Sequence, residues 1–435
     1  MTLRRAFRAS ILHCLADPGE ANASSAIEYF DDGLLVVNNG LVEQLGPAAA
    51  LLAGLSADVE LIECRDKLII PGLIDCHVHY PQIDMIASYG TQLLDWLERY
   101  AYPTECRFSD VQHAAEVAAY FADALLRNGT TTALVFATVH VESADAIFAA
   151  AEQRGMRLIA GKVLMDRNCP EQLRDGPDGG IEASRKLIDR WHGKGRLSYA
   201  ITPRFAITSS NRQLQAAGEL AAEFPDVYLQ THLAENAAEI DMVAKLFPKN
   251  RSYYDVYDRF GLSRARSVFA HCLNIDDADR QQLQRRGAAI AFCPGSNLFL
   301  GSGLFDLRSA SNSRIRVGIG SDVGGGSSLN LLRTLSDAYK ALQLNGQSLP
   351  GFRALYLATL GAAKALYLDD RIGNFASGKE ADFIMLDSSS SPAVKRRLSQ
   401  STDVAEKFFA LMTLGDDRAV AATYLMGRSV FTAGE

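Results

Sequence analysis

The stretch LIIPGLIDCHVH, residues 68–79, decides the fold. Its apolar run predicts a buried β-strand, and two histidines, His77 and His79, stand at its end. Side chains two residues apart on a strand point to the same face. Both imidazoles can therefore bind one metal ion at the carboxyl end of this strand. An H-x-H pattern is a weak signal alone, so the rest of the chain has to supply further ligands.

Seven similar runs follow, separated by longer segments with the apolar period of helices. They are TTALVFATVH (131–140), RLIAGKVLMD (157–166), LSYAITPRF (197–205), VYLQTHLAE (227–235), SVFAHCLN (267–274), AAIAFCPGSN (288–297) and RVGIGSDVG (316–324). Eight strands that alternate with helices predict an α/β protein with a (β/α)₈ TIM-type barrel. The active site of such a barrel lies at the carboxyl ends of its strands, and each of these runs ends in polar residues.

The two ends of the chain differ from this middle part. LLVVNNGLVEQLG (34–46) carries the Asn-Asn-Gly signal of a β-hairpin, and residues 382–387 and 423–432 also read as strands. A chain of 435 residues is long for one domain. We expect a small β-sandwich domain formed from residues 1–67 plus 375–435, beside a catalytic barrel formed from residues 68–374.

Composition limits the classes of partner. A net charge of −7 and a pI near 5.7 argue against binding nucleic acid, whereas a small neutral substrate is compatible. No window approaches 18 consecutive apolar residues, so we expect no membrane span. The seven cysteines are scattered and form no C-x-x-C pair, which indicates a reducing compartment and a cytoplasmic protein.

Three more ligand-type residues stand at or near the ends of later runs: His232, His271 and Asp322. Nitrogen ligands with one carboxylate suit Zn²⁺ or Fe²⁺, whereas Mg²⁺ and Ca²⁺ prefer oxygen-only sites. Any one of these histidines alone is more often a hydrogen-bonded structural residue. Purely structural roles are much harder to accept for ligand-type residues that occur at four strand ends in the order of the barrel. The sequence therefore predicts a metal centre.

Glu235 follows His232 by three residues in THLAEN (231–236). A metal of this type lowers the pKa of a bound water toward ~7 and so provides a nucleophile at neutral pH. Adding water to an amidine-type carbon also needs a proton delivered to the ring nitrogen and to departing ammonia. A carboxylate that carries a proton meets this need, and Glu235 is the candidate. The alternative is an acidic residue in the first turn of the next helix.

These motifs resemble the amidohydrolase superfamily, and within it the guanine deaminases. The superfamily pattern is matched by PGLIDCHVH (71–79), FAHCLN (269–274), GSDVG (320–324) and IGNFASGKEADFIMLD (372–387). The closer match is carried by YPQ (80–82), LLDWLERYAYPTECRF (93–108), FATVH (136–140), GKVLMD (161–166), ITPRFA (201–206), THLAEN (231–236), YYDVYD (253–258) and CPGSNLFL (293–300).

The resemblance implies hydrolysis of guanine to xanthine and ammonia by a homodimer. It implies the following residue roles: His77, His79, His232 and Asp322 hold the metal, Glu235 and Asp322 move protons, His271 orients the nucleophile or oxyanion beside the metal, and Gln82, Arg204 and Phe205 contact the purine. Two-metal members of the superfamily carry a lysine at the end of strand four, where this chain has Arg204. A guanidinium cannot become a carbamate, so we expect one Zn²⁺ per chain, with Fe²⁺ as the alternative.

Arg204 also supplies a chemical reason for guanine. Its guanidinium presents only donors, which match the acceptors O6 and N7 of guanine, whereas adenine would present its N6 donor. An unpaired buried polar contact of this kind allows discrimination of order 10⁴. The alternatives are structural: an ion pair at the barrel rim for Arg204, plain packing for Phe205 and a loop hydrogen bond for Gln82.

Two other functions stay open at this point. One keeps the chemistry but changes the substrate to another aminopurine, a pterin or a triazine; the other is a non-catalytic scaffold, which would normally lack ligands. Pro81 to about Ser109 is long and rich in aromatic residues, and we interpret it as a functional loop and a candidate lid. His140 is either a neighbour of the site or an ordinary loop residue.

Overall fold

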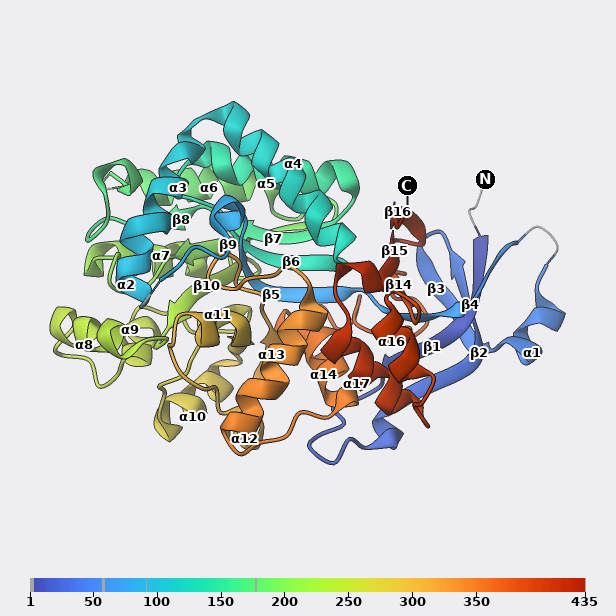
Figure 1. Cartoon of the computed structure of the whole chain (residues 1–435). Helices are drawn as coiled ribbons and strands as arrows, with labels where there is room; N and C mark the ends of the chain where they lie inside the picture. Colours follow the sequence, from blue (N-terminus) through green and yellow to red (C-terminus); the bar gives the residue numbers. More distant parts are fainter. Residues whose placement is uncertain (1–3, 57–58, 91, 177, 435) are drawn as a thin grey trace.

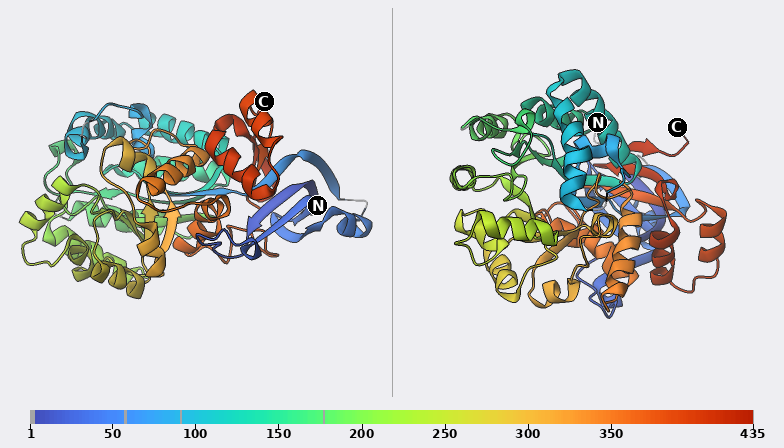
Figure 2. Two further views of the ribbon diagram at one scale, coloured as in Figure 1. Left: turned by 60° about the horizontal axis from the view of Figure 1, so that its bottom comes forward. Right: turned by 60° about the vertical axis from the view of Figure 1, so that its left-hand side comes forward.

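The computed structural model describes residues 4–56, 59–90, 92–176 and 178–434. A barrel of strands surrounded by helices forms the larger part, and a second sheet that carries both termini lies to one side of it (Figure 1). The turned views in Figure 2 show the same arrangement, with the C-terminal helices packed against helices of the barrel. None of the helices in the described residues is both long and apolar enough to cross a membrane.

The barrel confirms the predicted α/β fold. Its eight principal strands are all parallel, in the order β13-β12-β11-β10-β9-β7-β6-β5. Their bounds are β5 (Leu73–His79), β6 (Thr130–Phe136), β7 (Arg157–Gly161), β9 (Leu197–Pro203), β10 (Tyr228–Leu233), β11 (Ser267–His271), β12 (Ala289–Phe292) and β13 (Arg316–Ile319), with the short β8 (Val163–Leu164) beside β9. The segment after β13 closes the ring onto β5, because Asp322 N donates to His77 O (2.9 Å) and His79 N to Val323 O (2.8 Å).

Helices connect these strands along the outside of the barrel. They are α4 (Val111–Arg127), α5 (Val141–Arg154), α6 (Gly179–Trp191), α7 (Asn211–Glu223), α8 (Ala237–Leu246), α9 (Tyr253–Arg259), α10 (Asp277–Arg286), α11 (Pro294–Phe299), α12 (Leu307–Asn312), α13 (Leu331–Leu344), α14 (Gly351–Ala358) and α15 (Leu360–Ala365). Local signals set several ends: Asp110 and Ser210 cap the first turns of α4 and α7, and Gly155 ends α5 in the left-handed conformation.

The second sheet combines strands from both ends of the chain. Its order is β16-β15-β14-β4-β1-β2-β3. The bounds are β1 (Arg4–Cys14), β2 (Ile27–Asn38), β3 (Leu41–Pro47), β4 (Glu60–Pro71), β14 (Phe383–Asp387), β15 (Val420–Leu425) and β16 (Arg428–Thr432), with α16 (Pro392–Leu398) and α17 (Val404–Leu414) before β15. The predicted hairpin joins β2 to β3 through Asn39 and Gly40, both with positive φ, as a tight hairpin turn requires.

The run 68–79, read from the sequence as one barrel strand, is divided between the two sheets. Its first residues end β4 in the terminal sheet, and the barrel strand β5 begins at Leu73. Gly72 lies at the change because a Cβ there would collide with the side chain of Thr131. The domain limits at residues 67/68 and 374/375 stay a prediction.

The stretch from Pro81 to Ser109 is helical rather than an extended loop. It contains η3 (Tyr80–Met85), α2 (Leu93–Trp96), the π-helical turn η4 (Leu97–Ala101), α3 (Tyr102–Cys106) and η5 (Arg107–Ser109). Several of its large apolar side chains are buried, among them Trp96 (2% exposed) and Phe108 (0%), whereas Tyr89 is exposed. The segment is thus a packed wall above the carboxyl end of β5.

Candidate active site

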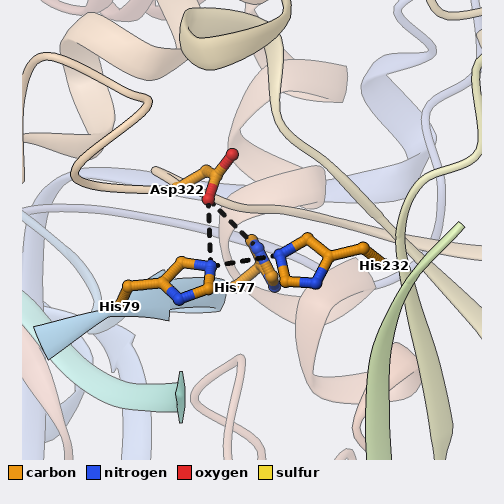
Figure 3. A group of neighbouring side chains, drawn as sticks. All are labelled: His77, His79, His232 and Asp322. Atoms are coloured by element: carbon orange, nitrogen blue, oxygen red, sulfur yellow. Dashed lines mark hydrogen bonds and ion pairs between the residues drawn. The ribbon is translucent and has the colours of Figure 1, made fainter. Parts of the chain in front are cut away.

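Three histidines and one aspartate converge at the carboxyl ends of the barrel strands (Figure 3). His77 and His79 come from β5, His232 from β10, and Asp322 from the turn after β13. His79 Nε2 lies 3.1 Å from His232 Nε2, and Asp322 Oδ1 lies 3.1 Å from His77 Nε2 and 3.5 Å from His79 Nε2. One ligand atom from each of the four lies within 4.8 Å of all the others.

The backbone at these positions departs from regular strand. The β5–β6 register shifts between Asp75 and Val78, which places an irregularity at His77, and Asp322 has a φ of 50°. Such irregularities re-aim side chains next to active sites. With this backbone conformation, the side chains of His77 and His79 both point to the candidate metal site, as the H-x-H pattern predicts.

Buried hydrogen bonds orient the ligands. His232 Nδ1 donates to Arg204 O (2.6 Å), which leaves Nε2 free to face the other ligands. Asp75 accepts from His77 N (3.1 Å) and from Ser321 N (3.0 Å), and so ties β5 to the segment that carries Asp322. Burial raises the pKa of Asp75 to about 7. Asp75 stands in the motif PGLIDCHVH, but the motif alone did not indicate a role for it.

The four residues fit a single Zn²⁺ or Fe²⁺ ion. Burial, followed by the neighbouring histidines, lowers the pKa values of His79 and His232 well below the ordinary value, and neutral imidazole is the form that binds a metal. His77 Nε2 is buried and, although Asp322 Oδ1 lies 3.1 Å away, it makes no well-formed hydrogen bond among the described residues. A cation at this point would satisfy that atom, and three imidazoles with one carboxylate suit these two ions.

Glu235 and His271 lie against this group. Glu235 Oε2 is 3.4 Å from His271 Nε2, which is itself 3.7 Å from Asp322 Oδ2. Burial raises the pKa of Glu235 to about 7, so its carboxyl group can both hold and release a proton near neutral pH. Burial alone would lower the pKa of His271, but the carboxylates of Glu235 and Asp322 outweigh it and raise the pKa.

Two side chains that the sequence analysis missed hold these groups in place. Ser302 Oγ donates to Glu235 Oε1 (2.9 Å), and His271 Nδ1 shares a hydrogen bond with Asn297 Oδ1 (2.9 Å). Asn297 lies in the motif CPGSNLFL (293–300), but the motif did not indicate that this residue contacts His271.

A pocket with about 400 Å³ of empty space, counted out to open solvent, lies above the ligands. Its lining consists of His79, Gln82, Leu93, Trp96, Leu97, Arg204, Phe205, His232, Glu235, His271, Leu300, Asp322 and Gly325. The predicted purine-contact residues Gln82, Arg204 and Phe205 all lie here, whereas His77 lies in the ligand group behind the cavity wall. The apolar part of the lining comes largely from the 81–109 segment.

His140 does not line this cavity. It is half-buried, and its Nδ1 shares a hydrogen bond with Thr138 Oγ1 (3.0 Å). This contact favours the loop interpretation of His140.

Comparison with known proteins places this site in a family. Residues 68–430 match the model of the amidohydrolase family. The guanine deaminase of Escherichia coli (strain K12) is 48% identical over 408 residues, which are 94% of this chain and 93% of that protein. The solved structure of E. coli guanine deaminase superposes with a TM-score of 0.96 at 47% identity, covering 99% of this chain and 100% of that one. A guanine deaminase from C. acetobutylicum with guanine bound in its active site gives a TM-score of 0.89 at 26% identity, covering 98% and 100%.

The chain therefore belongs to the amidohydrolase family, whose members are metal-dependent hydrolases. Within that family it belongs with the guanine deaminases.

Proposed function

We propose that this protein hydrolyses guanine to xanthine and ammonia, and that the residues at the carboxyl ends of the barrel strands have the following roles. One observation carries the proposal: three of the four candidate metal ligands, two further ionisable side chains and a set of hydrogen-bond donors line a single pocket, with His77 directly behind its wall. The similarity to guanine deaminases along nearly the whole chain supports the same substrate.

His77, His79, His232 and Asp322 would hold one Zn²⁺. When bound, such an ion lowers the pKa of water and polarises it for attack. Arg204 at the end of β9 supports a single ion, because a guanidinium cannot supply the bridging carbamate of a two-metal site.

The proton steps use the two carboxylates. Asp322 takes a proton from the attacking water as the oxygen adds to C2 of guanine. Glu235 delivers its proton to the ring nitrogen beside C2. It then takes the remaining proton of the added oxygen and passes it to the amino group, so that the C2–N bond breaks and ammonia leaves as the C2 carbonyl forms. The proton held by Asp322 then restores the acid form of Glu235. His271, within 4 Å of both carboxylates, orients the nucleophile or the developing oxyanion.

The other end of the cavity would select the purine. Arg204 and Gln82 can donate to the acceptors O6 and N7 of guanine. Phe205 supplies an aromatic face beside the ligands, since its ring centroid lies 6.5 Å from that of His232. Leu93, Trp96 and Leu97 exclude water from the bound base.

The proposal also covers the native ion, the oligomeric state and the cellular location of the protein. The native ion is Zn²⁺ rather than Fe²⁺, the protein is a homodimer, and it works in the cytoplasm without a nucleic-acid or membrane partner. Its negative charge and its seven free cysteines support the last statement.

Ammonia release from guanine, adenine and cytosine, measured together with metal content on one purified preparation, tests the function. We expect rapid release from guanine alone and close to one zinc per chain. Activity in metal-free protein, or no release from guanine, would overturn the proposal.

A further inference from the structure

One buried carboxylate in the site has no part in the chemistry above. Glu105 lies in α3, and its side chain is 1% exposed. Its oxygens accept two hydrogen bonds from Arg204 Nη1 (2.9 and 2.7 Å), and Oε1 accepts a third from Gln82 Nε2 (2.8 Å). Glu105 thus contacts both polar groups proposed to bind the purine.

The contact with Glu105 fixes the orientation of the Gln82 amide. Gln82 Oε1 accepts from Gly324 N (3.2 Å), while Nε2 donates to Glu105. A backbone N–H requires an acceptor and a carboxylate requires a donor, so the two partners together exclude the flipped amide. The second hydrogen of Nε2 is then left for the cavity, which Gln82 lines. Gln82 therefore offers a ligand there an N–H donor in a fixed orientation.

The same carboxylate fixes Arg204. Within the described part of the chain, the guanidinium donates through Nη1, and both of those bonds go to Glu105. The ring of Tyr102, also on α3, packs against the guanidinium, with Cζ 5.4 Å from the ring centroid. These contacts with Glu105 and Tyr102 leave the Nη2 and Nε donors of Arg204 available to a ligand. Because both contacts come from α3, this helix sets the direction in which those donors point.

Glu105 also balances a charge. Arg204 is 2% exposed and stands beside ligands that would hold a dication. Without Glu105 the guanidinium would be a buried, uncompensated cation, which is costly and would repel the metal.

We propose that Glu105 is a positioning residue that sets the specificity of the cavity: it holds the Gln82 amide as a donor and fixes the direction of the Arg204 donors, so that the site accepts a purine with an acceptor at position 6 and rejects one with an amino group there. This inference rests on the proposed function. It adds that the direction of hydrogen bonding is imposed from α3, outside the ligand and proton-transfer groups.

The test replaces Glu105 with Gln, which keeps the shape but removes the charge and one acceptor. The matched control is Glu98→Gln, the same chemical change at an exposed position on the same wall. Metal content, melting temperature, and kcat and KM are measured for guanine and for 2,6-diaminopurine, which has an amino group in place of O6. Glu105→Asp serves as the conservative variant, because it restores the charge one methylene short.

For Glu105→Gln we expect KM for guanine to rise about 10- to 100-fold with kcat changed much less, since the lost interaction orients the base rather than the reacting atoms. The preference for guanine over 2,6-diaminopurine should narrow by about tenfold or more, because Gln82 can now turn its oxygen toward the ligand. Glu105→Asp should recover part of the preference, and Glu98→Gln should behave like the unmodified protein.

A purely structural ion pair would give a different result. The melting temperature of Glu105→Gln would fall while KM and the purine preference stayed at the values of Glu98→Gln, and the inference would be wrong. If the unmodified protein released no ammonia from guanine, the proposed function would fail first. If Glu105→Gln did not fold, the KM and preference of Glu105→Asp would decide: unchanged values would overturn the inference.

Discussion

At the scale of single residues, Glu235 combines burial with a carboxyl group that titrates near neutrality. It is 2% exposed, and burial raises its pKa to about 7. Glu235→Gln keeps the volume and the hydrogen bond from Ser302 but cannot carry a proton. We expect kcat for ammonia release to fall about 10²-fold or more, because general acid–base catalysis contributes at least this much. Steady-state kinetics with metal analysis of the same sample measures it.

The control for this substitution is Glu219→Gln on the exposed face of α7. Both variants should retain the metal, because neither residue belongs to the ligand group. Turnover of Glu235→Gln close to that of Glu219→Gln would remove Glu235 from the proton-transfer steps.

Sequence reasoning identified the four residues of the candidate metal site because strand ends constrain their positions strongly. His77, His79, His232 and Asp322 each follow an apolar run, and the carboxyl ends of barrel strands meet at one place. Glu105 was missed because its partner Arg204 is 99 residues away and Glu105 itself follows no strand. Local pattern carries no information about such a contact.

At the scale of elements, the segment from Pro81 to Ser109 was predicted as a loop although its sequence contains helical spacing. Leu93, Trp96, Leu97 and Ala101 follow the helical spacing and are all buried, yet the segment was predicted as a loop. Its helices are each only a few residues long, and pieces this short are stable only through tertiary packing. Sequence alone shows the spacing but not the surface that stabilises it.

A second prediction concerns the packing of α7 against the turn after α9. A Cβ added at Gly218 would collide with the backbone carbonyl of Phe260, and a backbone atom cannot move aside cheaply. Gly218→Ala should therefore destabilise the protein by about 1–3 kcal/mol, as other overpacking substitutions do. Thermal or urea unfolding measures this change, and kcat per folded, metal-loaded molecule should be unaffected.

Gly179→Ala in the first turn of α6 is the matched control. Among the described residues, no atom lies within 4 Å of the position its Cβ would take. Alanine there should be neutral or stabilise by up to about 1 kcal/mol, because it restricts the unfolded chain. Equal stability of the two variants would show that α7 can shift to accommodate the methyl group.

At the scale of the whole molecule, the metal should stabilise the fold as well as catalyse. His77 Nε2 is buried without a well-formed hydrogen bond among the described residues, and a cation there would satisfy it. Any ligand that binds only the native state adds to its stability. Removing the metal with a chelator should abolish ammonia release and lower the melting temperature, and added Zn²⁺ should restore both. Unchanged ammonia release after verified metal removal would contradict the assigned ligand group.

The joint between the two sheets depends on contacts that the sequence did not reveal. Strands at both termini were predicted, but not the ion pairs that hold them to the barrel. Glu380 and Asp382, just before β14, accept from Arg157 at the start of β7 and from Arg196 just before β9. These side chains are 3–14% exposed, so the charges are buried against one another at the amino ends of the barrel strands.

Breaking this network should affect stability without affecting the chemistry. Glu380→Gln leaves Arg157 and Arg196 short of a counter-charge, and removing one partner of a buried pair costs about 3–5 kcal/mol. The matched change, Asp178→Asn, breaks an exposed pair with Arg212 and should cost less than about 1 kcal/mol. Unfolding of both variants with zinc bound gives the comparison, and kcat and KM for guanine should stay normal in each. Since the network lies at the opposite end of the barrel strands from His77 and Asp322, a large loss of kcat in folded, zinc-loaded Glu380→Gln would mean that the terminal sheet controls the geometry of the site. An equally small cost in both variants would mean that apolar packing, rather than these charges, holds the two sheets together.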